Sequence, residues 1–202
     1  QIMSLVLVFI LLFILSESIS AMRVDADPRS ILSFMDKQLS PELDILRVTT
    51  DLSPDDHLVF RIRTRGERSD REKNEDYFLL QILHEKNYIF LIPLNKQTDG
   101  KVLIYEHDFE TENSLKSTAF RKSSLQADFS AKYLSQSAEF TIPLDWINFG
   151  ANFSYDAYTI QARIQDNILQ VNKVYDQARK GRAEVEHVSA ITLLNKICLS
   201  QK

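Results

Sequence analysis

The sequence predicts an all-β chain that folds as an antiparallel β-sandwich of the jelly-roll or immunoglobulin-like kind, with about nine strands and short terminal helices. Three observations predict this class. Apolar and polar side chains alternate along many short segments, which is the two-residue period of a strand with one face exposed to solvent. Turn-forming residues separate these segments. Between them, no stretch shows the helical period that a parallel α/β sheet would need.

The first residues are typical of an export signal. Residues 2–15 form an apolar run broken by Ser4, and the small residues Ser18, Ser20 and Ala21 follow. We therefore expect a signal peptide over residues 1–21 and a single domain over residues 22–202, exported to a periplasm or to the extracellular space. The run is shorter than the roughly 20 residues that span a bilayer, so membrane attachment is expected only if the leader is retained.

The clearest strand covers residues 58–64, where Leu58, Phe60 and Ile62 alternate with Arg61 and Arg63. Two other segments are apolar at nearly every position, which predicts strands covered on both faces and joined as a hairpin through residues 84–87. These segments are 77–83 and 88–92. The remaining predicted strands are 45–50, 101–107, 125–133, 138–142, 158–165 and 168–175.

Helix is expected only at the two ends of the domain. Residues 30–38 predict a short helix, and apolar residues recur at near-helical spacing from residue 183 to 199. Part of the second segment, residues 187–194, also fits a strand, so both interpretations stay open. Tight turns are predicted at residues 53–56, 98–100 and 166–167, which contain Pro, Gly, Asp and Asn.

Composition excludes several functional classes. The net charge is −4 with both signs interspersed, so no basic surface for nucleic acid is expected. The four glycines are far apart, which rules out the P-loop, the dinucleotide-binding turn and the nucleophile elbow. The single cysteine, Cys198, has no partner for an internal disulfide. The histidines show no metal-binding spacing, and the sequence predicts neither a metal site nor a cofactor.

The one tryptophan, Trp146, follows Pro143 in a turn or short helical loop at a strand end. A tryptophan on such a loop can stack on a sugar ring or anchor a partner, and it can equally plug the end of a core. The tyrosines are numerous enough to line a groove, although most fall at inward strand positions. Tyr105 and Tyr155 lie near predicted loops and are the expected exceptions. The seven are Tyr77, Tyr88, Tyr105, Tyr133, Tyr155, Tyr158 and Tyr175.

Four of the segments together resemble a β-sandwich superfamily that includes family 9 carbohydrate-binding modules and DOMON domains. They are residues 58–62, 76–80, 138–144 and 158–162, and the resemblance extends over residues 44–179. Members of that superfamily bind sugars, often through paired tryptophans and calcium, or bind haem through histidine and methionine. Since this chain has one tryptophan, the resemblance implies the fold and no particular ligand.

The sequence therefore predicts an exported, non-catalytic binding module that recognises a glycan or an envelope protein through Trp146, Tyr105 and Tyr155. One alternative is a hydrolase of envelope polysaccharide, in which the strand carboxylates Glu106 and Asp108 act as acid and base. Another is a structural partner whose exposed edge strand pairs with a second chain.

Overall fold

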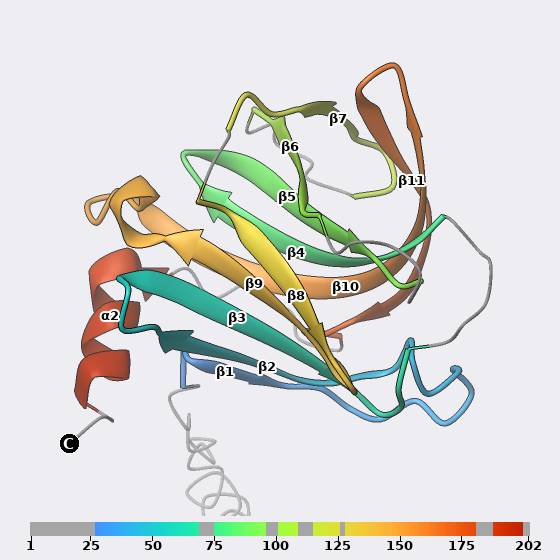
Figure 1. The fold of residues 1–202 in the computed structure, drawn as a ribbon, viewed down its shortest axis with the longest axis horizontal. Coiled ribbons are helices and arrows are strands. Elements are labelled where there is room, and N and C mark those ends of the chain that lie inside the picture. Colours follow the sequence, from blue (N-terminus) through green and yellow to red (C-terminus); the bar gives the residue numbers. More distant parts are fainter. Residues whose placement is uncertain are drawn as a thin grey trace, which may run out of the picture.

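The computed structural model describes residues 27–68, 75–95, 101–108, 115–125, 128–180 and 188–199. Within these residues, two antiparallel sheets pack against each other, and one α-helix, α2 (Ala190–Leu199), follows the last strand (Figure 1). The predicted all-β sandwich is therefore confirmed. The leader predicted over residues 1–21 lies outside the described residues.

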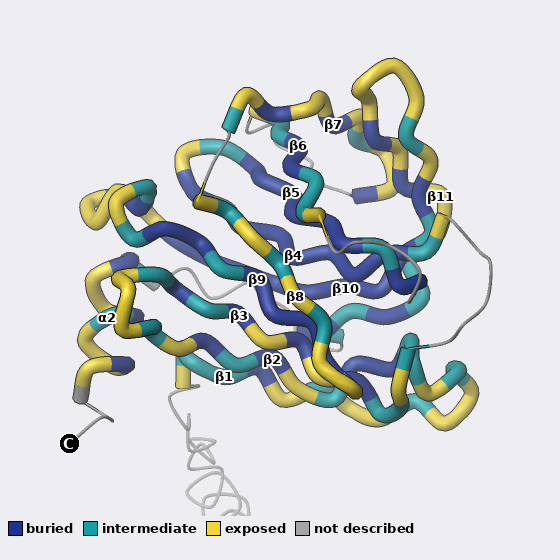
Figure 2. Tube along the Cα trace, in the orientation of Figure 1, coloured by how far each residue is buried: buried dark blue, intermediate teal, exposed yellow. Residues whose placement is uncertain are grey.

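The smaller sheet has five strands in the order β1-β2-β3-β9-β8. At its centre, Phe60 on β3 lies opposite Phe140 on β9, and both side chains are fully buried. The outer strand β8 is mostly exposed, whereas its neighbour β9 is buried (Figure 2). The five strands are β1 (Ser30–Leu32), β2 (Ile45–Leu52), β3 (His57–Thr64), β9 (Ser137–Pro143) and β8 (Ser130–Leu134).

The larger sheet has seven strands in the order β11-β7-β6-β5-β4-β10-β12, and β11 also pairs with β10. Six of its strands therefore form a closed ring, because the pairing that begins at β10 returns to β10 through β11. The long strand β10 makes this closure by pairing with β4 along one edge and with β11 along the other. The seven strands are β4 (Asp76–His84), β5 (Lys86–Pro93), β6 (Leu103–His107), β7 (Ala119–Lys122), β10 (Asn152–Gln165), β11 (Ile168–Gln177) and β12 (Val188–Ser189).

This topology creates two apolar cores on opposite faces of β4 and β5. Phe78 and Phe90 point into the core between the two sheets, while Leu79 and Leu91 point into the closed ring. Both faces of these strands are thus removed from water, which explains their near-continuous apolar sequence and confirms the prediction of strands covered on both sides.

Two of the predicted turns join the strands as expected. Asp166 and Asn167 both have positive φ, at 51° and 64°, and connect β10 to β11 in a two-residue hairpin. Such a turn suits residues that tolerate left-handed backbone, as Asp and Asn do. The hairpin between β4 and β5 is confirmed and is tighter than expected, since Glu85 alone separates the paired residues His84 and Lys86.

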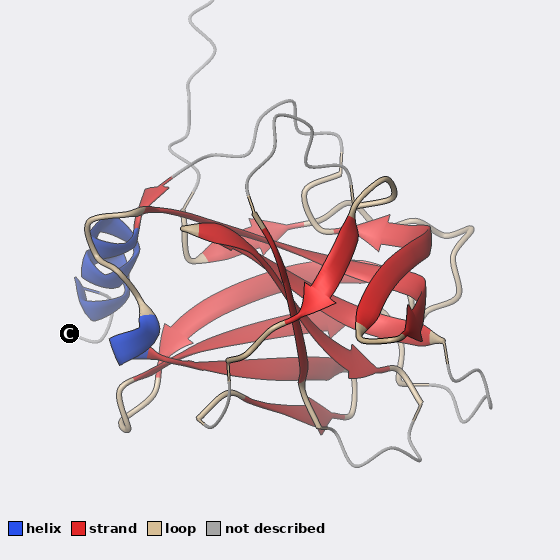
Figure 3. Cartoon of the chain, turned by 90° about the horizontal axis from the view of Figure 1, so that it is seen from above, coloured by secondary structure: helices blue, strands red, loops and turns tan. Residues whose placement is uncertain are grey.

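Several predicted elements were wrong or shifted. Residues 30–38 form strand β1 and a loop, because Ser30–Leu32 gains backbone partners on β2 that a local helical pattern cannot reveal. In the predicted strand 125–133, residues 126–127 lie outside the described residues, and the described pairing with β9 begins at Ser130. β7 was missed because it has one buried residue, Phe120. The C-terminal helix is confirmed from Ala190, and it lies at the same end of the sandwich as the short 3-10 helix η1 (Leu144–Trp146) (Figure 3).

Candidate functional site

Trp146 lies at the end of η1 with its ring enclosed by other rings. His84, Tyr88, Phe90 and Phe129 surround it edge-on, with ring centroids 5.0 to 6.0 Å away. The side chain is half-buried and packs against the core between the sheets. This placement favours the core-plug interpretation over a flat platform presented to a sugar.

The expectation that Tyr105 and Tyr155 are exposed is wrong. Each retains 3% of its accessible surface, because each lies within a strand that is longer or more enclosed than its local sequence indicates. Tyr105 packs inside the closed ring. Tyr155 packs between the sheets and donates a hydrogen bond from its hydroxyl to the carbonyl of Pro28, at 2.6 Å. Burial raises the pKa of Tyr155 to about 12.

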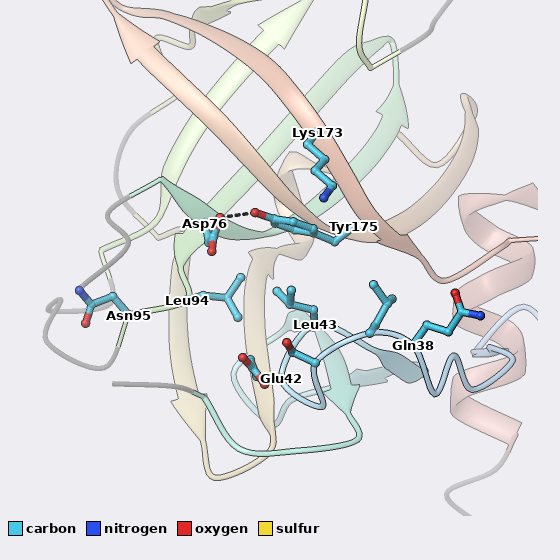
Figure 4. A pocket seen from close by; sticks show the side chains of 10 residues that line it. Gln38, Glu42, Leu43, Asp76, Leu94, Asn95, Lys173 and Tyr175 are labelled. Carbon is cyan, nitrogen blue, oxygen red and sulfur yellow. Dashed lines mark hydrogen bonds between the residues drawn. The ribbon is translucent and has the colours of Figure 1, made fainter. Parts of the chain in front are cut away.

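A pocket of about 270 Å³, called here the loop pocket, opens where the connection between β1 and β2 meets the larger sheet (Figure 4). That connection contributes one wall, β4 and the residues after β5 contribute a second, and β11 contributes the third. Polar groups alternate with leucines around it, as in small-molecule sites where a few polar groups set orientation. Its lining residues are Gln38, Leu39, Ser40, Glu42, Leu43, Asp76, Leu94, Asn95, Lys173 and Tyr175.

The wall from the β1–β2 connection is held by two residues after β3. Arg65 donates from its guanidinium to the carbonyl of Leu39 at 2.6 Å and to the carboxylate of Asp44 at 2.8 Å. Gly66 donates its backbone N–H to the carbonyl of Pro41, and a Cβ at Gly66 would stand 2.3 Å from the Cβ of Pro41. The wall therefore depends on a residue without a side chain at position 66.

The same wall is tied to the larger sheet. Thr159 on β10 donates its hydroxyl to the carbonyl of Leu43 at 2.6 Å. Asp176 on β11 accepts the backbone N–H of Ile45 at 2.7 Å. Both polar side chains are nearly fully buried, so these contacts replace water and fix the loop against the sheet.

Among the described residues that line the loop pocket, Tyr175 is the one aromatic side chain. Its hydroxyl donates to Asp76 at 2.9 Å, and Figure 4 shows the ring lying between Lys173 on one side and Leu43 and Leu94 on the other. The ammonium of Lys173 is 4.9 Å from the ring centroid. Burial, followed by the neighbouring Asp76 carboxylate, raises the pKa of Tyr175 to about 12, so the hydroxyl stays protonated and remains a donor.

The loop pocket thus combines an aromatic ring, two carboxylates, two amides and an ammonium group. Such a set can accept and donate hydrogen bonds to a ligand rich in hydroxyls while the ring covers an apolar face of that ligand. Tyr175 is one of the seven tyrosines considered from the sequence, which favoured core packing for most of them and expected only Tyr105 and Tyr155 to be exceptions. The other lining residues carry no motif, and only the meeting of four distant segments brings them together.

The carboxylates of the hydrolase alternative lie elsewhere, on and just after β6. Glu106 accepts from Lys86 at 2.7 Å and from the hydroxyl of Ser123. Burial by itself would raise the pKa of Glu106, but these two hydrogen bonds outweigh burial and leave the pKa below its usual value. A glycosidase acid needs a raised pKa to hold its proton near neutral pH. The ionised state of Glu106 therefore opposes that role.

Comparison with protein-family models, curated proteins and solved structures found no match. Within the described residues, no helix has the length and apolar character required to cross a bilayer.

Proposed function

We propose that this chain is an exported, non-catalytic binding module that holds a short glycan in the loop pocket. Export rests on the predicted leader over residues 1–21. The observation that carries the glycan assignment is the Tyr175 ring, hydrogen-bonded to Asp76, in a pocket of about 270 Å³ that Glu42 and Asn95 also line.

A sugar ring has an apolar face of C–H groups and a rim of hydroxyls. In the loop pocket, the face of the Tyr175 ring toward the exposed Lys173 side chain is suited to the apolar face once that flexible side chain moves aside, while the carboxylate of Glu42 and the amide of Gln38 can bond the hydroxyls. The ring is anchored by its bond to Asp76, so little side-chain freedom is lost when a ligand stacks on it. This preorganisation is what a non-catalytic binding site requires.

The edge-strand alternative is less well supported. Within the described residues, β8 pairs with β9 along one edge, and its other edge has no strand partner. However, Lys132 lies at the middle of β8 and is paired with Glu139 at 2.8 Å, with its side chain 68% exposed. A charged side chain at this position is a common device that discourages pairing with another chain.

A glycan array followed by titration calorimetry tests the proposal. We expect Tyr175→Ala to weaken binding of the selected glycan roughly tenfold or more, because it removes the stacking surface. Tyr175→Phe keeps the ring and should lose less affinity. Gln170→Ala, an exposed change on the same strand and outside the pocket, is the matched control.

Trp146→Phe separates the loop pocket from the site that the sequence favoured. An aromatic ring at position 146 preserves most of the core packing, so we expect glycan affinity to remain at the wild-type value. The proposal is refuted if no glycan binds, or if Tyr175→Ala binds as tightly as the wild type while Trp146→Phe binds weakly.

A further inference from the structure

A second cavity opens between the two sheets and shares no lining residue with the loop pocket. This inter-sheet groove has a volume of about 570 Å³, within the range of roughly 300–1,000 Å³ that small-molecule sites occupy. One side is formed by β6 and the residues after β7, and the other by the start of β8. Its lining consists of residues 101–105, 122–123, Leu125 and 129–131.

The floor of the inter-sheet groove is apolar and continuous with the core. Phe129 stacks on Phe90 with 5.6 Å between centroids and meets Trp146 edge-on at 5.5 Å. Val102 and Leu125 pack against the same core yet remain partly exposed. Partly exposed apolar side chains around a cavity gain free energy when an apolar ligand covers them.

The charged residues in the described lining of the inter-sheet groove are both lysines. Lys101 and Lys122 are exposed, and the described lining contains no carboxylate. Neither lysine has an ion-pair partner among the described residues. A net positive rim on a chain whose net charge is −4 is a local feature that favours an anionic group.

We propose that the inter-sheet groove binds an amphiphile with a single alkyl chain and an anionic head, with the chain over Phe129 and the head between Lys101 and Lys122. The apolar floor favours the alkyl chain of the ligand, and the two ammonium groups favour a negative charge on its head group. This site is separate from the glycan site, so either can exist without the other.

Trp146 fluorescence can be used to measure binding in the inter-sheet groove. Trp146 is the sole tryptophan, and it contacts Phe129 in the groove floor. Titration with sodium laurate, below the concentration at which it forms micelles, should change Trp146 fluorescence in a saturable manner. Dodecyl phosphate tests a phosphate head in place of a carboxylate. Dodecyltrimethylammonium carries the same chain with a positive head, and we expect it to bind more weakly.

Two variants locate the site. Charge reversal in Lys101→Glu with Lys122→Glu should raise the Kd for laurate roughly tenfold, as expected for two solvent-exposed charge contacts. Ala131→Phe fills the groove and should abolish binding, with thermal unfolding used to verify that it folds. Lys116→Glu with Arg163→Glu, two exposed cations outside the lining, changes the net charge by the same amount and should leave the Kd unchanged.

Calorimetry serves as the second measurement if Trp146 fluorescence does not respond. The proposal is overturned if calorimetry also detects no binding of laurate or dodecyl phosphate, or if the cationic analogue binds equally well. It is also overturned if the double lysine variant keeps the wild-type Kd, or if an extended apolar peptide binds the groove while both anionic amphiphiles fail to do so. None of these results bears on Tyr175 and the glycan site.

Discussion

Asp44 is the buried charge on which the loop pocket depends, and its replacement by asparagine is the most direct test of the structure. The side chain is fully buried. Its carboxylate accepts from the backbone N–H of Asp36 at 3.0 Å and from Arg65 at 2.8 Å, and it lies 3.6 Å from the ammonium of Lys180. Asp44→Asn keeps the shape and one acceptor oxygen while removing the negative charge.

The loss of stability in Asp44→Asn depends on which ion-pair partners the two neighbouring cations, Lys180 and Arg65, retain. Lys180 retains Asp176 at 2.8 Å, whereas Arg65 loses the one carboxylate with which it pairs among the described residues. Breaking a fully buried pair costs about 3–5 kcal/mol, and an exposed pair contributes less than about 1 kcal/mol. Because the Arg65 side chain is 26% exposed and can recruit water, we expect a loss of about 2–3 kcal/mol.

Urea unfolding measures this loss. With a slope of about 1–3 kcal/mol per molar urea, the midpoint should fall by about 1 M. Asp27→Asn is the matched control, since the Asp27–Arg29 pair is exposed and its loss should cost less than about 1 kcal/mol. The double variant Asp44→Asn with Arg65→Met should be less destabilised than the sum of the single changes.

Two results would contradict this reasoning. One is an Asp44→Asn protein within about 0.5 kcal/mol of the wild type, the range of ordinary surface changes. The other is strict additivity in the double variant, which would mean that Asp44 and Arg65 do not interact. If the reasoning holds, Asp44→Asn should also weaken the binding of any ligand in the loop pocket, because Arg65 holds the wall of that pocket through Leu39.

Three further predictions concern single residues. Gly66→Ala should cost about 1–3 kcal/mol in urea unfolding, because its Cβ would clash with Pro41 at 2.3 Å; a wild-type midpoint would contradict this. Burial lowers the pKa of His84, whose Nε2 accepts the backbone N–H of Asn148, so stability should fall as the pH drops below about 6.5. His84→Gln should lose less over that range, and equal losses would exclude His84 as the cause. Burial raises the pKa of Asp156, so stability should fall as the pH rises above about 3.9; Asp156→Asn should flatten that slope and raise the thermal midpoint at pH 7.

Local pattern was sufficient for most strands because burial of one face leaves a period of two in the sequence. Residues 58–64 alternate for that reason, and the continuous apolar run at 88–92 indicated burial on both faces. Both predictions match the structure. The two-residue turn at Asp166 and Asn167 was also readable, since left-handed backbone restricts the residue types that can occupy it.

The residues proposed to form the binding site could not be predicted in the same way. Tyr105 and Tyr155 looked accessible from their neighbours along the chain, but partners distant in sequence bury them. The opposite holds for Asp76 and Tyr175, which are 99 residues apart and meet only because β10 pairs with both β4 and β11. A contact between residues so far apart cannot be predicted from the local sequence pattern.

By itself, the sequence determined the fold class, the positions of most strands and the double burial of the central hairpin, because the hydrophobic effect acts on each segment and leaves a periodic trace there. Closure of six strands into a ring, the split of the interior into two cores and the assembly of the loop pocket were decided by tertiary structure alone. These features depend on which strand edges pair and on where buried charges find partners, and both are contacts between segments far apart in the chain.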